Sequence, residues 1–232
     1  MSDPKLIVAD ATDAVHGVAL VLHGGRSKSR MPVRAAQPAV LRMRPFVSAL
    51  RAHSRNGLVV AQLRYRVRGW NGAERSPVPD TRWALDRLAQ RYPGVPIALV
   101  GHSMGGRAAM YAADHDAVRS VVGLAPWIEP GDPVRPLAGR RVLIMHGDAD
   151  RMTDPRASAS FARSAEAVAE AVTYVGVGGE RHAMLRRASL WHRLSTAFVA
   201  ATVLGRGAEG SVGTEIANIL GKALAGEAVV VV

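Results

Sequence analysis

The chain has 232 residues, of which 48% are hydrophobic and 21% charged, with no cysteine and a formal net charge of +11 at pH 7. This balance is typical of one soluble globular domain and excludes a disordered or fibrous chain. The lack of cysteine excludes disulfides and thiolate metal sites. No apolar run is long enough to span a membrane, and no secretory signal is visible at the N-terminus. We therefore expect a cytoplasmic protein.

The positive charge does not by itself indicate a nucleic-acid partner. Only three of the 30 basic residues are lysine, and the arginines are scattered along the chain without a recognition motif. We expect no nucleic-acid partner. The basic stretch "RSKSRMPVRAAQP" at residues 26–38 has two interpretations, a solvated loop or a surface that favours an anionic acyl or leaving group. We favour the solvated loop.

Short apolar runs alternate with helical patterns along the chain. Strands are predicted at residues 18–25, 57–67, 96–103, 118–127, 140–147 and 171–179, and helices at residues 39–54, 78–92, 104–114, 155–170 and 182–204. Asp80 is expected to cap the second helix and Asp154 the helix that starts at Pro155. The strands are continuously apolar rather than alternating, which indicates a parallel sheet covered on both faces. The pattern predicts a doubly wound α/β sheet with helices on both faces.

Residues 1–204 are predicted to form one domain, because no repeat or linker divides them. Residues 205–232 are Gly- and Ala-rich and are expected to form a tail with a short helix. Its apolar stripe comprises Ile216, Ile219, Leu220, Ala223 and Leu224. We expect this helix to dock either on the body of the domain or on a second subunit. The second alternative would make the protein a homodimer.

One serine lies in the setting that a nucleophile requires. In "IALVGHSMGGRAAM", Ser103 stands between a predicted strand and a predicted helix, with Gly101 and Gly105 two residues to either side. A tight turn there exposes the hydroxyl and strains the serine backbone, and glycines at these spacings avoid collisions. The short motif alone is weak evidence, but its strand-to-helix context supports it.

The chain resembles the α/β-hydrolases over roughly residues 15–204. The stretches that carry the resemblance are "GHSMGG", "LHGG", "HGDADRMTDPRAS" and "GERHAML". The resemblance implies a sheet of about seven strands, because the N-terminal part is shorter than that of the family. Only "IEPGDPVRPLAG" separates Trp127 from Arg140, so no cap domain is expected. The site should be open, as in dienelactone hydrolases, carboxylesterases and cutinases.

The family order of Ser, then Asp or Glu, then His implies a triad of Ser103, Asp150 and His182. His182 follows a predicted strand in a loop, whereas His192 lies inside a helix. Asp150 lies in a loop that is similar to the acid loop of monoacylglycerol lipases, where the aspartate of "ADR" is catalytic. Asp148 is expected only to shape that turn.

The resemblance also implies an oxyanion hole and a pocket. The backbone N–H of Met104 is one expected donor, and Gly25, with Arg26 as the alternative, supplies the other. His23 is expected to brace this loop. "GLAPW" is similar to the "TPW" stretch of cutinase-like polyester hydrolases, whose tryptophan lines the acyl pocket, so Trp127 is a pocket candidate, with a buried tryptophan at the strand end as the alternative. His102 is a second pocket candidate.

These residues predict a serine hydrolase of small, short-acyl carboxylic esters or thioesters, acting through an acyl-enzyme on Ser103. The expected partner is a small-molecule ester, and no cofactor or metal is expected. A non-catalytic protein that binds small molecules on the same scaffold is the alternative.

Overall fold

The structure is a computed structural model that describes residues 3–11, 14–205, 213–227 and 229–232. One eight-stranded sheet runs through it in the order β1-β3-β2-β4-β5-β6-β7-β8. The strands are β1 (Lys5–Ala9), β2 (Gly17–Leu22), β3 (Leu58–Arg64), β4 (Ile97–His102), β5 (Val118–Leu124), β6 (Arg141–Gly147), β7 (Ala171–Val177) and β8 (Val229–Val231). Only β1 is antiparallel, pairing with β3 at the sheet edge.

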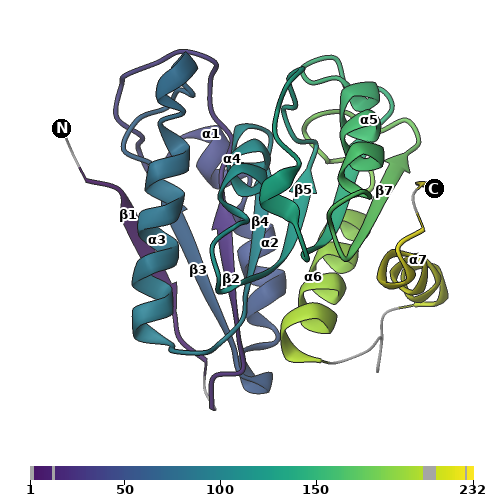
Figure 1. The fold of residues 1–232 in the computed structure, drawn as a ribbon, viewed down its shortest axis with the longest axis horizontal. Helices are drawn as coiled ribbons and strands as arrows, with labels where there is room; N and C mark the ends of the chain where they lie inside the picture. The colour runs from purple at the N-terminus through teal and green to yellow at the C-terminus, as the bar shows by residue number, and fades with distance from the viewer. Residues whose placement is uncertain (1–2, 12–13, 206–212, 228) are drawn as a thin grey trace.

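Helices cover both faces of the sheet (Figure 1). They are α1 (Pro38–Leu41), α2 (Arg44–Arg51), α3 (Pro77–Arg91), α4 (Met104–Ala112), α5 (Pro155–Ala165), α6 (Ala188–Leu204) and α7 (Thr214–Ala225). Side chains of α3, α4 and α5 share one buried cluster, and those of α2, α6 and α7 share another. Within the described residues, no helix is long and apolar enough to cross a membrane.

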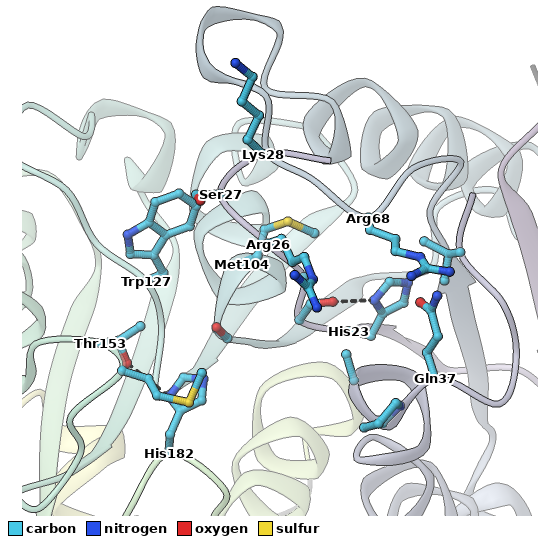
Figure 2. A pocket seen from close by; sticks show the side chains of 17 residues that line it. His23, Arg26, Ser27, Lys28, Gln37, Arg68, Met104, Trp127, Thr153 and His182 are labelled. Carbon is cyan, nitrogen blue, oxygen red and sulfur yellow. Dashed lines mark hydrogen bonds between the residues drawn. The ribbon is translucent and has the colours of Figure 1, made fainter. Parts of the chain in front are cut away.

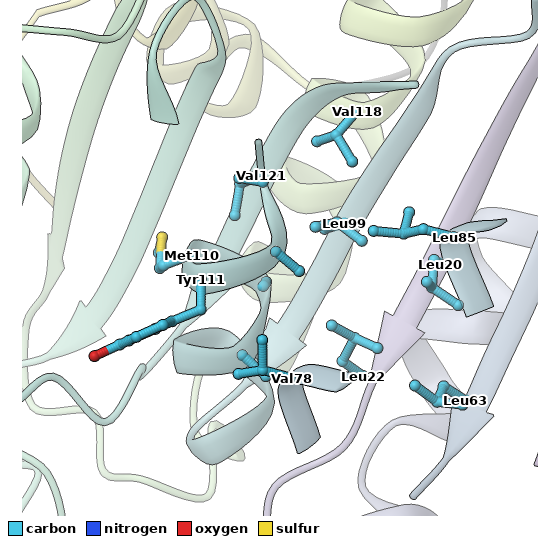
Figure 3. Close-up of a cluster of buried hydrophobic side chains, with 14 of the residues drawn as sticks. Leu20, Leu22, Leu63, Val78, Leu85, Leu99, Met110, Tyr111, Val118 and Val121 are labelled. Atoms are coloured by element: carbon cyan, nitrogen blue, oxygen red, sulfur yellow. The ribbon is translucent and has the colours of Figure 1, made fainter. Parts of the chain in front are cut away.

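The central strands are apolar on both sides because each side meets a helical layer. In β2, Leu20 and Leu22 pack into the cluster with α3 and α4, whereas Ala19 and Val21 pack into the cluster with α2 and α6. Figure 3 shows the first of these clusters, with Leu20 and Leu99 beside Leu85. The prediction of a parallel sheet covered on both faces is thus confirmed.

The structure corrects four local predictions. The helix expected at 39–54 is broken into α1 and α2, because Pro45 lacks an N–H and its ring crowds the carbonyl four residues earlier. The helix expected at 182–204 starts only at Ala188. Asp80 does not cap α3 but lies inside it, where its carboxylate accepts hydrogen bonds from the Arg66 backbone and guanidinium. The sheet has eight strands rather than about seven.

The C-terminal segment is part of the sheet architecture. Ile216, Ile219, Leu220 and Ala223 are buried on one face of α7, which confirms the predicted stripe. The final valines form β8, which pairs in parallel with β7. Packing of α7 against α6 and β7 therefore docks this helix on the body of the domain.

Candidate active site

Ser103 occupies a tight turn between β4 and α4. Its φ of 55° and ψ of −119° lie in a region that non-glycine residues rarely adopt. A Cβ on Gly101 would lie 2.3 Å from the Gly105 carbonyl oxygen, and one on Gly105 would lie 2.6 Å from the Leu22 carbonyl oxygen. Both positions require glycine for this turn, as the sequence indicated.

Asp150 and His182 come together from two different loops at the carboxyl end of the sheet. Asp150 follows β6 and His182 follows β7. The His182 Nδ1 lies 2.7 Å from the Asp150 Oδ2. Because an ionised carboxylate only accepts hydrogen bonds, Nδ1 carries the proton and Nε2 is left as the basic nitrogen.

The Asp150 carboxylate is buried and well supplied with donors. Its Oδ1 accepts from the backbone N–H groups of Met152 at 2.8 Å and Thr153 at 3.2 Å. Its Oδ2 accepts from His182, His146 and the Thr153 hydroxyl. Burial alone would raise the pKa of this carboxyl, but these hydrogen bonds outweigh it and hold the pKa well below its ordinary value. Asp150 therefore stays ionised at neutral pH.

A second chain of Ser, His and Asp shares this carboxylate. His146, at the end of β6, places Nε2 3.1 Å from Asp150 Oδ2 and Nδ1 2.8 Å from the Ser158 hydroxyl. Both Ser158 and His146 are completely buried, and Ser158 lies inside α5. Sequence reasoning missed this chain, because the family order of Ser, acid and His considers only a histidine that follows the acid. The four-residue spacing from His146 to Asp150 was its signal.

Thr153 is a further residue that sequence reasoning missed. Its hydroxyl lies 2.8 Å from Asp150 Oδ2, 3.1 Å from His182 Nδ1 and 3.2 Å from His146 Nε2. It thus connects the carboxylate with both imidazoles. Asp154 caps α5 as predicted, by accepting from the Arg156 N–H. Asp148 accepts from the Gly179 N–H, so its side chain links the loop after β6 to the loop after β7.

The loop after β2 brings glycine backbone against the serine turn. A Cβ on Gly25 would lie 2.3 Å from the Met104 side chain and 2.4 Å from the Arg68 carbonyl oxygen. In the described part of the chain, the N–H groups of Gly25 and Met104 have no acceptor. The Arg26 N–H donates to the Arg68 carbonyl at 2.8 Å. The prediction of Arg26 as the alternative oxyanion donor is therefore wrong, because its N–H already donates to the Arg68 carbonyl.

His23 braces this loop. Its Nδ1 donates to the Gly24 carbonyl at 2.7 Å, and its Nε2 accepts from the Tyr65 N–H at 3.3 Å. Burial is the main reason that the pKa of His23 is lowered to about 4. The imidazole is thus neutral and structural at physiological pH.

A pocket of about 810 Å³ opens over the serine turn. Ser103, Met104, Gly25, Arg26, Trp127 and His182 all line it. In Figure 2, His182, Thr153 and Trp127 lie on one side, and Arg68 and Gln37 lie on the other. Much of the wall comes from segments that follow β2, β4, β5, β6 and β7, which are parallel strands whose carboxyl ends meet at the same edge of the sheet.

His102 does not line this pocket, contrary to expectation. Its side chain is buried, and its Nε2 donates to the His182 carbonyl at 3.1 Å. Burial, followed by the nearby His182, lowers the pKa of His102 to about 3. A neutral His102 therefore supports the backbone of the His182 loop from behind.

Trp127 does line the pocket, and buried neighbours hold it there. The Arg107 guanidinium lies 4.3 Å from the Trp70 ring centre and 4.6 Å from that of Trp127. Arg107 is itself paired with Asp132 at 2.6 Å. The two indole rings lie edge to face with their centres 6.1 Å apart, and the cation–π contacts of Arg107 with both fix the pocket wall next to α4. Among the described residues, no cluster of potential ligands could hold a metal ion.

Comparisons with known proteins agree with this geometry. The family described as "alpha/beta hydrolase fold" matches residues 65–175. A search of curated proteins finds no match. Among solved structures, an esterase from Pyrococcus furiosus is 15% identical with a TM-score of 0.64, covering 87% of this chain and 91% of its own.

Two further structures have a similar likeness. A monoacylglycerol lipase from Paleococcus ferrophilus is 15% identical with a TM-score of 0.62, covering 85% of this chain and 99% of its own. A serine hydrolase without a lid from Xanthomonas campestris is 18% identical with a TM-score of 0.60, covering 85% of this chain and 88% of its own. This chain likewise has only a short connection, residues 125–140, where a cap would lie. Strand order, serine turn and these likenesses together show that the chain has the α/β-hydrolase fold and resembles its uncapped serine hydrolases.

Proposed function

We propose that this protein is a serine hydrolase that cleaves carboxylic esters or thioesters of small, short-acyl substrates. The observation that carries the proposal is the 2.7 Å contact between Asp150 and His182 at the rim of the pocket that Ser103 also lines. A nucleophilic serine needs a base, and the base needs an acid that fixes its tautomer. Asp150 supplies that acid.

The proposed reaction has two steps, acylation of Ser103 and hydrolysis of the acyl-enzyme. His182 Nε2 takes the proton of the Ser103 hydroxyl while the serine oxygen attacks the acyl carbon. The N–H groups of Met104 and Gly25 are free to stabilise the negative charge that develops on the carbonyl oxygen. His182 then protonates the leaving alcohol or thiol, and water, activated in the same way, releases the acid and regenerates Ser103.

Among the described residues, the hydrogen bonds of His182 do not include one from the Ser103 hydroxyl. Such bonds are commonly long without substrate and tighten when it binds. Ser158, by contrast, does contact a histidine, but it is completely buried inside α5. A nucleophile must reach its substrate, so Ser103 is the proposed nucleophile and Ser158 a support for His146.

The matched pair Ser103→Ala and Ser158→Ala tests this assignment on p-nitrophenyl esters. Ser103→Ala should lower kcat by at least about 10³-fold, because it removes the attacking atom. Ser158→Ala should keep kcat within about tenfold, because it removes only the hydrogen bonds of the Ser158 hydroxyl to His146 and to the Pro126 carbonyl, which lie behind Asp150. A fluorophosphonate probe should label the wild type and Ser158→Ala but not Ser103→Ala.

The opposite pattern, with activity lost in Ser158→Ala and kept in a folded Ser103→Ala, would refute the assignment. No hydrolysis and no labelling of the wild type would favour a non-catalytic binding protein. Within the ester series, kcat/KM should fall as the acyl chain lengthens, because an open pocket without a cap covers only a short chain.

A further inference from the structure

The pocket over Ser103 is lined by cationic side chains and by no acidic one. Arg26, Lys28 and Arg68 contribute to its wall, and none of the described aspartates or glutamates does. Figure 2 shows Arg26 between Met104 and His23 near the middle of the pocket, whereas Lys28 extends away toward the outside. Arg26 therefore lies near the middle of the pocket, and Arg68 lies in its wall beside Gln37.

These two arginines lack the ion pairs that neutralise others nearby. Arg30 pairs with Glu74, and Arg66 with Asp80. Arg68 instead donates to a neutral acceptor, the Pro32 carbonyl at 3.0 Å. Its other neutral acceptor, the Gln37 amide oxygen, lies 2.7 Å from Nη2 when that amide is turned to accept. In the described part of the chain the Arg26 guanidinium has no carboxylate partner. Two positive charges in one concave site are thus left for a ligand.

The position of the arginines indicates which part of the substrate would carry the negative charge. His182 must reach the leaving group to protonate it, so the leaving group lies on the His182 side. Arg68 and Gln37 lie on the opposite side of the pocket in Figure 2. An acyl group that extends away from the leaving group would point toward that side. A guanidinium matches a carboxylate in shape and charge.

We infer that the substrate's acyl group ends in a carboxylate, held by Arg26 and Arg68, so that the natural substrate is a half-ester or half-thioester of a dicarboxylic acid. This inference rests on the proposed hydrolase function for its chemistry. The recognition itself does not require turnover and can be measured without it. A volume of about 810 Å³ leaves room for an acyl chain of a few carbons together with its carboxylate.

Binding to the Ser103→Ala variant tests the recognition step alone. Calorimetric titration should show that monomethyl glutarate binds on the order of tenfold more tightly than methyl pentanoate, the neutral ester of matched chain length. Arg26→Gln and Arg68→Gln, each added to Ser103→Ala, should bring the ratio toward one. Arg30→Gln is the control, because Arg30 is an exposed loop arginine that is already paired with Glu74. It should leave the ratio unchanged.

Hydrolysis by the wild-type chain, which keeps Ser103, completes the test. The kcat/KM for monomethyl glutarate should exceed that for methyl pentanoate, and added salt should reduce this preference, because it screens partly exposed charges. Equal or tighter binding of methyl pentanoate would overturn the inference while leaving the hydrolase proposal intact. Tighter binding of methyl 4-phosphonobutanoate than of the glutarate ester would also overturn it, in favour of a phosphorylated acyl group. Selective binding without hydrolysis of any ester would support carboxylate recognition by the two arginines, but it would refute the hydrolase proposal and with it the assignment of a half-ester substrate.

Discussion

The backbone of Ser103 is held in a strained conformation by three hydrogen bonds. Its N–H donates to the Leu124 carbonyl at 3.0 Å, and its carbonyl accepts from the N–H groups of Arg107 and Trp127, both at 3.1 Å. A non-glycine residue in such a region costs on the order of 1–3 kcal/mol. The bonds to β5, α4 and the Trp127 loop supply the constraint that keeps the serine there. The same bonds tie the turn to the pocket wall.

Gly105→Ala should damage both stability and activity. The new Cβ would lie 2.6 Å from the carbonyl oxygens of Leu22 and His23, and this backbone cannot yield without moving the loop that carries Gly25. We expect the free energy of unfolding to fall by about 1–3 kcal/mol and kcat to fall with it. Urea unfolding and p-nitrophenyl ester hydrolysis would measure the two effects.

Gly221→Ala is the matched control for that substitution. Gly221 lies inside α7, and a Cβ there meets nothing within 4 Å. Alanine should therefore stabilise the protein by about 0.5–1 kcal/mol through its better helix propensity. Equal tolerance of alanine at positions 105 and 221 would contradict the close approach described here.

Among the elements, the loop between β7 and α6 depends on one buried carboxylate. Glu180 Oε1 accepts from the Arg181 N–H at 2.9 Å, and Oε2 accepts from the Arg187 N–H at 2.9 Å and the Trp191 indole at 3.3 Å. Burial would raise the pKa of Glu180, but these backbone donors lower it overall. The carboxylate thus pins both ends of the segment that contains His182, which explains why α6 starts only at Ala188.

Glu180→Gln should loosen this loop. A glutamine presents an NH₂ where Glu180 has an acceptor, so one of the donors is left without a partner, at a cost of about 1–3 kcal/mol. We expect faster amide hydrogen exchange over residues 181–187 and a kcat lowered by about tenfold, because His182 is held less well.

Glu215→Gln gives the comparison for Glu180. Glu215 pairs with the Arg187 guanidinium on the surface, where such pairs contribute only about 0–1 kcal/mol. It should change neither hydrogen exchange of the loop nor kcat appreciably. Similar effects of the two substitutions would show that Glu180 has no special part in placing His182.

At the scale of the whole molecule, His23 and His102 are buried as neutral imidazoles next to the active site. His23 and His102 have pKa values lowered to about 4 and about 3, mainly by burial. In the unfolded chain each would titrate near 6.5. Between these values the unfolded state binds more protons than the folded state, so stability is lost as the pH falls below about 6.5. The lowered pKa of Asp150 adds a loss in the same direction at more acidic pH.

The free energy of unfolding should therefore fall between pH 7 and pH 5. Each of the two histidines contributes a slope of up to about 1.4 kcal/mol per pH unit below pH 6.5. Urea unfolding at both pH values would measure the difference. His102→Gln removes one of the two titrations, so the difference between pH 7 and pH 5 should shrink. An unchanged difference would mean that His102 is not buried as a neutral group.

Much of the architecture was readable from local patterns. Continuous apolar runs such as Ile97–Val100 indicated strands with helices on both faces, since a strand exposed on one face would alternate. The glycines around Ser103 indicated a tight turn, because such a turn leaves no room for side chains at positions 101 and 105. This requirement depends only on the backbone of a few neighbouring residues. For the same reason, Ser103 and His182 could each be placed after the end of a predicted strand. These features depend on neighbours along the chain.

Other features depend on contacts between distant segments, and local sequence patterns do not predict these contacts. The short strand β1 forms because it pairs with β3 at one edge of the sheet. In the same way, β8 forms because it pairs with β7 at the other edge. Arg26 lost its expected role through a backbone bridge to a segment more than 40 residues away. His146 and Ser158 contact one another and Asp150 only because β6 and α5 pack together. These contacts form only when the chain folds, because each joins residues from elements that are far apart in the sequence. A short stretch of sequence therefore cannot show which hydrogen-bond partners a residue has or how deeply it is buried.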